Sequence, residues 1–249
     1  MKYLIFLMGA LSVLACRESG EPALSADQIV ARAIEVAGGD RYRTSRIEFD
    51  FRGLHYVSYR ENGKRVLERL TQTDSALIRD TRVGESFQRY VGDSLLILPD
   101  SMSRKYSNSV NSVHYFAYLP YGLDGQAVHR ELLGTVSIGD REYYKVRVTF
   151  SEQGGGEDFE DVFVYWFNTQ TFRPDYLAYL YHTDGGGMRL REAYNDREVG
   201  GIRFFDYKNY KPRVAVPVNA LDSLFLKGGM EELSVIELEN LQVIPGSYN

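Results

Sequence analysis

The feature that most constrains the fold is the short spacing between strand-like segments in the second half of the chain. Six segments carry aromatic and β-branched residues, and short connections rich in Gly, Asn, Asp or Pro separate them; they cover residues 134–138, 142–150, 161–168, 175–182, 187–195 and 202–210. A parallel return needs a crossover of about a dozen residues or more. Consecutive segments are therefore expected to pair antiparallel, which excludes a Rossmann fold and a TIM barrel.

A helix followed by a hairpin is expected at the start of the body. Ser25 and Gln28 form a capping box, and Gly38 supplies a stop after one apolar stripe at helical spacing. From Arg46 onward apolar residues recur at every second position, which is typical of a strand. An Asn-Gly turn follows at Asn62 and indicates a hairpin. Further strands are predicted near residues 64–73, 76–82, 86–91 and 94–98.

Three more helices and a last strand complete the prediction. The helices are expected over residues 101–119, 126–133 and 219–227, and the strand over residues 233–243. The expected fold class is α+β and mainly β: a single curved antiparallel meander sheet, an open or half barrel, with an N-terminal helix and a few covering helices. Nothing resembling a linker divides residues 25–249, so one β-rich domain is expected there.

The first residues indicate a secreted, anchored protein. Lys2 precedes an apolar run that is about half the ~20 residues needed to cross a bilayer, so residues 1–15 are interpreted as a signal peptide. The run ends at Ala15-Cys16, which resembles the lipobox of bacterial lipoproteins and implies lipidation at Cys16. The alternative is a plain signal peptide with a buried cysteine. Residues 16–24 are polar and contain Gly and Pro, which favours a flexible tether.

Composition narrows the function classes. The 249 residues include 19 Tyr and 13 Phe, a content of aromatic side chains that favours strands and excludes disorder and coiled coil. The formal charge of −5 gives no overall basic field for phosphates, so nucleic acid is not expected as a partner. Arg189 and Arg191 have acidic neighbours and are interpreted as part of a mixed, solvated face.

Two neighbouring strands are apolar on both faces. In residues 161–167, apolar side chains occupy both the odd and the even positions, and in residues 176–181 they occupy nearly all of them. Because alternate positions point to opposite faces, this indicates burial on both sides of the sheet. Either helices and neighbouring side chains fill both faces, or the curved sheet encloses an apolar cavity for a hydrophobic ligand. For the second alternative, the expected ligand-binding residues are Phe163, Trp166, Tyr179 and Tyr181.

Some of these features resemble known families. The lipobox, a helix that ends in Ala-Gly-Gly and a long antiparallel meander together resemble the half-open barrels of the lipoprotein-localisation (Lol) carriers and receptors. The segments Tyr106–Gly122, Gly154–Trp166 and Tyr179–Gly187 are similar to a family of bacterial envelope lipoproteins without an established function, over essentially the whole mature chain. The resemblance implies a cell-envelope location, facing the periplasm or the exterior, and supplies no activity.

An acidic, Gly-rich segment precedes the most apolar strand. Its carboxylates include Glu157, Asp158, Glu160 and Asp161. Flexible oxygen-rich loops suit calcium, although the spacing is not that of an EF-hand. The alternative is a solvated hairpin loop whose charges protect a strand from unwanted pairing. No other cofactor is expected.

His182 and Asp184 are the candidates for catalysis. They stand in a second Gly-rich turn, which lies beside the acidic, Gly-rich loop if adjacent strands pair in register. A carboxylate could then orient the imidazole of His182 as a general base. The alternative is an ordinary turn. His55 and His114 each stand alone on an apolar face, which is more typical of hydrogen-bonded core residues.

The sequence therefore leaves three functions open. The first is a lipid-anchored envelope protein that binds or carries an apolar ligand, a lipid or acyl chain. The second is an envelope hydrolase that uses His182 and Asp184 with the acidic loop. The third is a structural or assembly lipoprotein, for which an exposed aromatic patch is expected. The absence of a catalytic motif favours the first.

Overall fold

A computed structural model describes residues 23–156 and 158–246. The expected signal peptide, Cys16 and most of the tether lie outside these residues, as does Glu157. Within the described part of the chain, no helix combines the length and the apolar character needed to cross a bilayer.

The first of two antiparallel sheets, called sheet 1, is built mainly from the N-terminal half. It has seven strands in the order β14-β1-β2-β3-β4-β5-β6. Their bounds are β1 Ser45–Phe51, β2 Leu54–Glu61, β3 Lys64–Gln72, β4 Leu77–Val83, β5 Ser86–Val91, β6 Ser94–Leu96 and β14 Glu239–Pro245.

Sheet 2 contains seven strands in the order β13-β12-β11-β10-β9-β8-β7. Their bounds are β7 Val128–Ile138, β8 Arg141–Phe150, β9 Val162–Asn168, β10 Pro174–Tyr181, β11 Gly187–Val199, β12 Ile202–Pro212 and β13 Met230–Ile236. The helices are α1 Ala26–Ala37, α2 Arg41–Thr44, α3 Asp100–Ala117 and α4 Leu221–Leu226, with 3₁₀ turns η1 Thr183–Gly185 and η2 Val218–Ala220.

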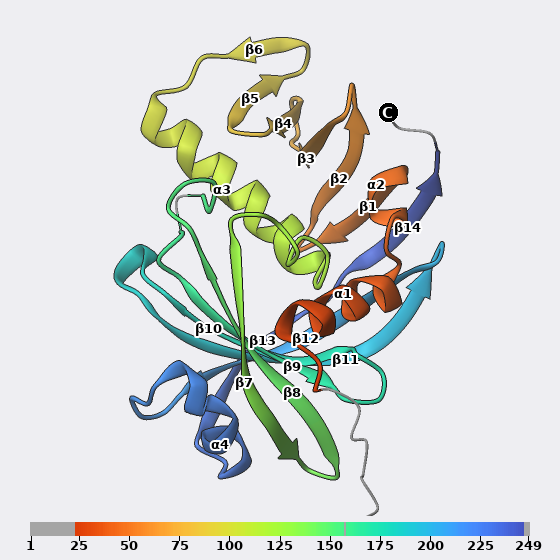
Figure 1. Ribbon diagram of the computed structural model, residues 1–249. Coiled ribbons are helices and arrows are strands. Elements are labelled where there is room, and N and C mark those ends of the chain that lie inside the picture. Colours follow the sequence, from red (N-terminus) through yellow and green to blue (C-terminus); the bar gives the residue numbers. More distant parts are fainter. Residues whose placement is uncertain (1–22, 157, 247–249) are drawn as a thin grey trace, which may run out of the picture.

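The chain passes directly from sheet 2 to sheet 1 between β13 and β14. Asp206 of β12 stabilises the segment that connects the two strands. Its Oδ1 accepts hydrogen bonds from the backbone N–H of Leu238 at 3.0 Å and from Arg197 Nη2 at 2.9 Å. Arg197 also donates to the Leu238 carbonyl. The two sheets are thus joined at one edge of each, and Figure 1 shows both curving around α1 and α3.

Helix α1 begins and ends where its sequence predicts. Ser25 accepts from the Gln28 N–H and the Gln28 side chain accepts from the Ser25 N–H, so the capping box is present. Gly38 closes the helix with φ +132°, and a Cβ there would lie 2.9 Å from the Gly201 carbonyl oxygen. Only glycine lets the helix end approach the β11–β12 turn so closely.

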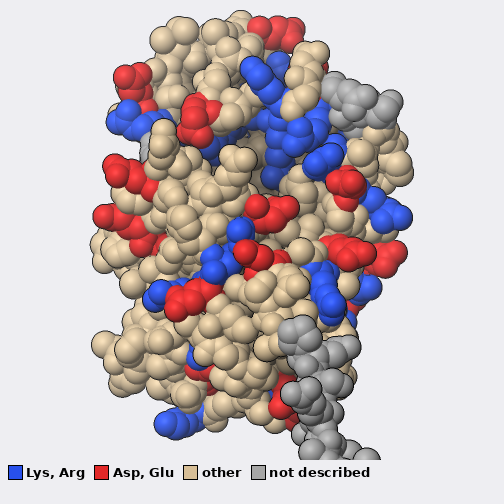
Figure 2. All heavy atoms as spheres, viewed as in Figure 1, with Lys and Arg blue, Asp and Glu red and all other residues tan. Residues whose placement is uncertain are grey.

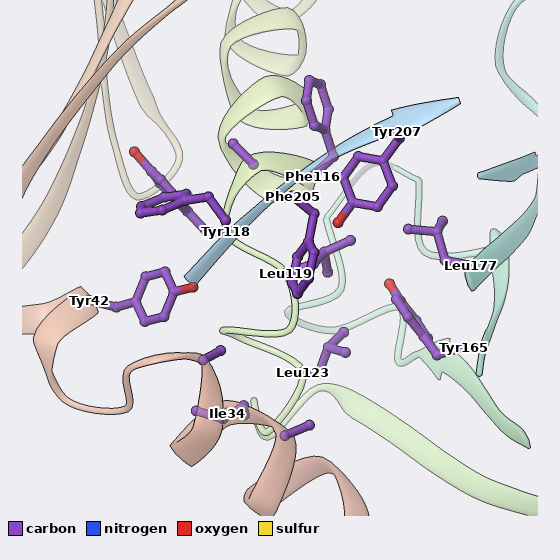
Figure 3. Packing of buried hydrophobic residues seen from close by; sticks show 14 of the residues in the cluster. Ile34, Tyr42, Phe116, Tyr118, Leu119, Leu123, Tyr165, Leu177, Phe205 and Tyr207 are labelled. Carbon is purple, nitrogen blue, oxygen red and sulfur yellow. The ribbon is translucent and has the colours of Figure 1, made fainter. Parts of the chain in front are cut away.

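Two hydrophobic clusters cover the two faces of sheet 2. The larger lies on its concave face, where α1, α3 and sheet 1 contribute Ile29, Val113, Phe49 and many others, and Figure 3 shows part of it. The smaller lies on the opposite face, beneath α4, around Trp166 and Leu221. Burial on both faces of β9 and β10, predicted from their composition, is confirmed.

The mainly β, open antiparallel fold with an N-terminal helix and covering helices is confirmed, with two differences. The meander is divided into two sheets, because α3 separates β6 from β7 and the last predicted strand changes sheets at Glu237–Leu238. The helix expected over residues 126–133 is wrong: most of that segment is the first part of β7, whose burial alternates with a period of two.

Candidate ligand cavity

A cavity of about 400 Å³ lies between α3 and the concave face of sheet 2. Its walls come from α3, the chain just after it, strands β8 to β11 and the acidic loop. They are Asn111, Ser112, Tyr115, Phe116, Leu119, Phe150, Gly155, Asp158, Asp161, Phe163, Leu177, Tyr179 and Arg191. Most of these side chains are aromatic or aliphatic. The polar ones are Asn111 and Ser112 on α3, Asp158 and Asp161 of the acidic loop, and Arg191 of β11.

Pairing of β9 with β10 builds the aromatic floor. Phe163 lies directly opposite Tyr179, and their rings stack with centroids 5.5 Å apart. Phe150 of β8 meets Phe163 edge to face at 5.8 Å. Leu177, two residues before Tyr179 and therefore on the same face, extends the floor under α3.

Tyr115 connects the helix to this floor. Its ring meets Phe163 at 5.8 Å, and its hydroxyl lies 3.0 Å from that of the fully buried Tyr165. Burial raises the pKa of Tyr115 to about 12. Both hydroxyls therefore stay protonated near neutral pH and act as hydrogen-bonding groups.

Arg191 places a positive charge in the apolar wall. Its guanidinium lies 5.0 Å from the Phe116 ring centre and 5.1 Å from that of Tyr179, and Nη2 donates to the Tyr179 hydroxyl at 3.1 Å. Its Nε is buried without a hydrogen-bond partner. The interpretation of Arg191 as part of a solvated face is wrong, because strand alternation turns it onto the concave face.

The acidic loop and the second Gly-rich turn lie together at one end of the cavity. The Asp161 Oδ1 accepts from the His182 backbone N–H at 3.2 Å and lies 3.4 Å from His182 Nδ1. Asp158 accepts from the Thr183 hydroxyl at 2.7 Å. Burial raises the pKa of Asp161, while the hydrogen bond from His182 opposes that shift. His182 thus has Asp161 as a carboxylate partner, and the side chain of Asp184, the partner expected from the sequence, is not among those described.

The expected ligand-binding residues separate onto two faces. Phe163 and Tyr179 line the cavity, and Tyr181 lies next to Tyr179 with ring centres 5.9 Å apart but is not in the wall. Trp166 is fully buried on the opposite face, where its Nε1 donates to Asp222 of α4 at 3.2 Å. Any contact with a ligand stays a prediction.

The calcium candidates within the described residues, Asp158, Glu160 and Asp161, do not assemble into a metal site. Over residues 23–156 and 158–246, no group of three or more His, Cys, Asp or Glu side chains is placed to hold a metal ion. Asp158 and Asp161 are bound instead to Thr183 and His182.

The other histidines lie away from the cavity. His55 bonds Asp50 at 2.7 Å, and His129 bonds Ser151 at 2.6 Å. The fully buried His114 lies between Tyr118 and the backbone carbonyl of Glu68. No pattern in the sequence indicates Tyr115 or Arg191 as cavity residues, because the position of α3 over sheet 2 is a tertiary property.

Comparison with known proteins decides the family. Residues 26–239 match a protein family described as a family of unknown function, DUF6503. The chain belongs to this family. The expectation of an uncharacterised family is thereby confirmed. Among curated proteins, none matches the sequence of this DUF6503 member.

Two solved structures have folds similar to that of this chain. One is a DUF1329 family protein from Desulfovibrio piger, with 13% identity, 87% of this chain and 91% of that chain covered, and a TM-score of 0.50. Another is a LolA superfamily protein from Nitrosomonas europaea, with 14% identity, coverage of 88% and 94%, and a TM-score of 0.49. At these identities the comparison concerns the fold alone.

Proposed function

We propose that this protein is a lipid-anchored protein of the bacterial cell envelope that binds one apolar chain, of a lipid or acyl compound, in the cavity beneath α3. The observation that carries the proposal is the aromatic cavity of about 400 Å³. Ligand sites in proteins span ~300–1,000 Å³. At about 30 Å³ for a group the size of water or methylene, the cavity holds roughly a dozen such groups, which is most of one chain of palmitate length and too few for several chains.

Arg191 places a positive charge at one position of the otherwise largely apolar cavity wall, and this favours one orientation of a ligand. Its Nε lacks a hydrogen-bond partner, and its charge lies against the aromatic rings of Phe116 and Tyr179. A carboxylate or phosphate at the end of an apolar chain would supply the missing acceptor. The proposed ligand is therefore an amphiphile with its anionic end at Arg191.

The anchor is a separate part of the proposal. Residues 1–15 would be removed as a signal peptide, Cys16 would carry the lipid, and residues 16–24 would tether a single domain of residues 25–249 to the membrane. Mass spectrometry of the mature N-terminus tests this, because Cys16→Ala should abolish both the lipid mass and membrane retention. A wild-type N-terminus without lipid would contradict the anchor and leave the cavity proposal intact.

Native mass spectrometry of protein purified without detergent tests the cavity. Ser112 is exposed on α3 and lines the cavity, so Ser112→Trp should fill the space and remove a co-purified lipid mass. Lys105→Trp, at an exposed position of the same helix outside the wall, is the matched control and should retain it. Wild-type protein that is always empty, and that fails to take up added palmitate, would contradict the proposal.

The hydrolase alternative rests on one observation. The half-exposed His182 lies 3.4 Å from Asp161, which lines the cavity and has its pKa raised by burial. In this alternative His182 acts as a general base toward a ligand ester or amide. Substitution of His182 by Ala should then abolish turnover of envelope lipids while leaving the midpoint of thermal unfolding within a few degrees of wild type.

A further inference from the structure

Five arginines share one face of sheet 1, here called the arginine face. The strand register places Arg60 of β2 opposite Arg65 of β3. It places Asp80 of β4 between Arg69 and Arg89 of the two neighbouring strands. Arg82 is two residues after Asp80 and therefore on the same face of β4. This is the face toward α3, because Arg69 Nη1 donates to Ser109 of that helix at 2.8 Å. The members of the arginine face are Arg60, Arg65, Arg69, Arg82 and Arg89.

One carboxylate serves two of these arginines. Asp80 is almost fully buried and accepts from Arg69 and from Arg89, each at 2.6 Å. Arg89 also lies 3.5 Å from the ring centre of Tyr106 on α3. This triad retains one positive charge, and its internal bonds fix the inner part of the face.

Arg65 has aromatic neighbours and no carboxylate. Its guanidinium lies 4.9 Å from the ring centre of Tyr118 and 5.5 Å from that of Tyr121. Within residues 23–156 and 158–246 it forms no ion pair. Burial lowers the pKa of Arg65, and the charge of Arg60 lowers it further. A partly buried guanidinium that lies against two aromatic rings without an anion has lost hydration, so an anionic ligand beside it would be favoured.

Arg82 has an unused donor. Its Nε is buried without a hydrogen-bond partner, and its Nη2 reaches only the exposed Glu85, at 3.4 Å. The space-filling view shows Lys and Arg side chains gathered around a hollow over β2 to β4 (Figure 2). The Arg82 side chain is 13% exposed, so solvent reaches part of it.

We propose that the arginine face binds a phosphate-bearing group, with Arg65 and Arg82 as its principal donors. Guanidinium forks match the geometry of phosphate oxygens, and a phosphate offers three strong acceptors and up to two charges to several donors at once. A single carboxylate offers fewer acceptors. This site lies on sheet 1, and none of its five arginines is in the cavity wall, so it does not depend on the function proposed for the cavity.

Isothermal titration calorimetry of the whole mature chain tests the proposal. The probes are inorganic pyrophosphate, dihexanoyl phosphatidic acid and, as a neutral headgroup, dihexanoyl phosphatidylcholine. Arg82→Gln and Arg65→Gln should each weaken binding about tenfold or more, the usual effect of losing a charge-assisted hydrogen bond. Arg79→Gln is the matched control, because Arg79 is exposed on the opposite face of the same strand.

Each outcome has a defined meaning. Binding of pyrophosphate, weakened by Arg82→Gln and not by Arg79→Gln, supports a site for phosphate itself. Binding of phosphatidic acid alone, with the same response to the variants, supports a lipid headgroup as the source. Failure of both anions to bind, equal binding of phosphatidylcholine, or equal losses for Arg79→Gln and Arg82→Gln would overturn the proposal. Thermal unfolding of each variant confirms that it is folded.

Discussion

The phenolic oxygens of Tyr115 and Tyr165 lie 3.0 Å apart and fix α3 over the strand that forms the cavity floor. Tyr165 is fully buried, so Tyr115→Phe leaves its hydroxyl without this partner. We expect the free energy of unfolding to fall by about 1–3 kcal/mol. Urea denaturation measures it. The double variant with Tyr165→Phe should lose less than the sum of the single variants, and strict additivity would contradict the coupling.

The ion pair of Lys145 and Asp222 fastens α4 to the opposite face of sheet 2. The two groups are 2.6 Å apart and largely buried. Asp222→Asn leaves the lysine charge uncompensated, so a loss of about 3–5 kcal/mol in the free energy of unfolding is expected. The exposed pair of Lys211 and Glu231 is the control, and Glu231→Gln should cost less than about 1 kcal/mol. Equal losses would contradict this account.

His114 should make stability depend on pH. Burial lowers its pKa from 6.5 to about 3, with the charge of Arg65 as a further cause. Between these values the unfolded chain binds the proton more readily than the folded chain does. The free energy of unfolding is therefore fully retained above pH 6.5 and decreases as the pH falls through this range, by up to about 1.4 kcal/mol per unit.

Chemical denaturation at several pH values between 7.5 and 4 measures this effect. The difference between wild type and His114→Gln isolates it from the carboxyl groups, which titrate in both proteins. We expect the wild type to lose stability more steeply than the variant as the pH falls. Parallel curves for the two proteins would show that His114 does not contribute.

Arg191 should select for an anionic end on the ligand. Arg191→Met keeps the apolar stem and removes the charge, so affinity for palmitate should fall about tenfold, while affinity for hexadecanol should change little. Competition with a fluorescent fatty acid measures both. Trp166→Phe, on the far face of the sheet, should leave both affinities unchanged. Equal losses for acid and alcohol would mean that Arg191 only packs the wall.

Local signals in the sequence predict much of the fold. The capping box at Ser25 and the stop at Gly38 determine α1, and short connections require antiparallel pairing. The helix predicted over residues 126–133 is wrong, because a few apolar residues fit both the helical period of 3.6 and the strand period of two when tertiary contacts are unknown. Division into two sheets depends on where α3 packs, which no local pattern encodes.

Only part of the cavity can be predicted from sequence. Phe163 and Tyr179 share a face through register, and both are in the wall. Trp166 is three positions from Phe163, so its side chain must point to the other face of the strand. Both faces of this strand are apolar, so the sequence does not indicate which face lines the cavity. Arg191 comes from a strand whose charges resemble a solvent-facing edge.

Photo-crosslinking with a diazirine-bearing palmitate, followed by peptide mass spectrometry, tests the central claim most directly. The account predicts that the label attaches to peptides containing Tyr115, Phe163 or Tyr179, and that Ser112→Trp abolishes this labelling while Lys105→Trp does not. Labelling confined to other surfaces, or unchanged by Ser112→Trp, would contradict a ligand site beneath α3.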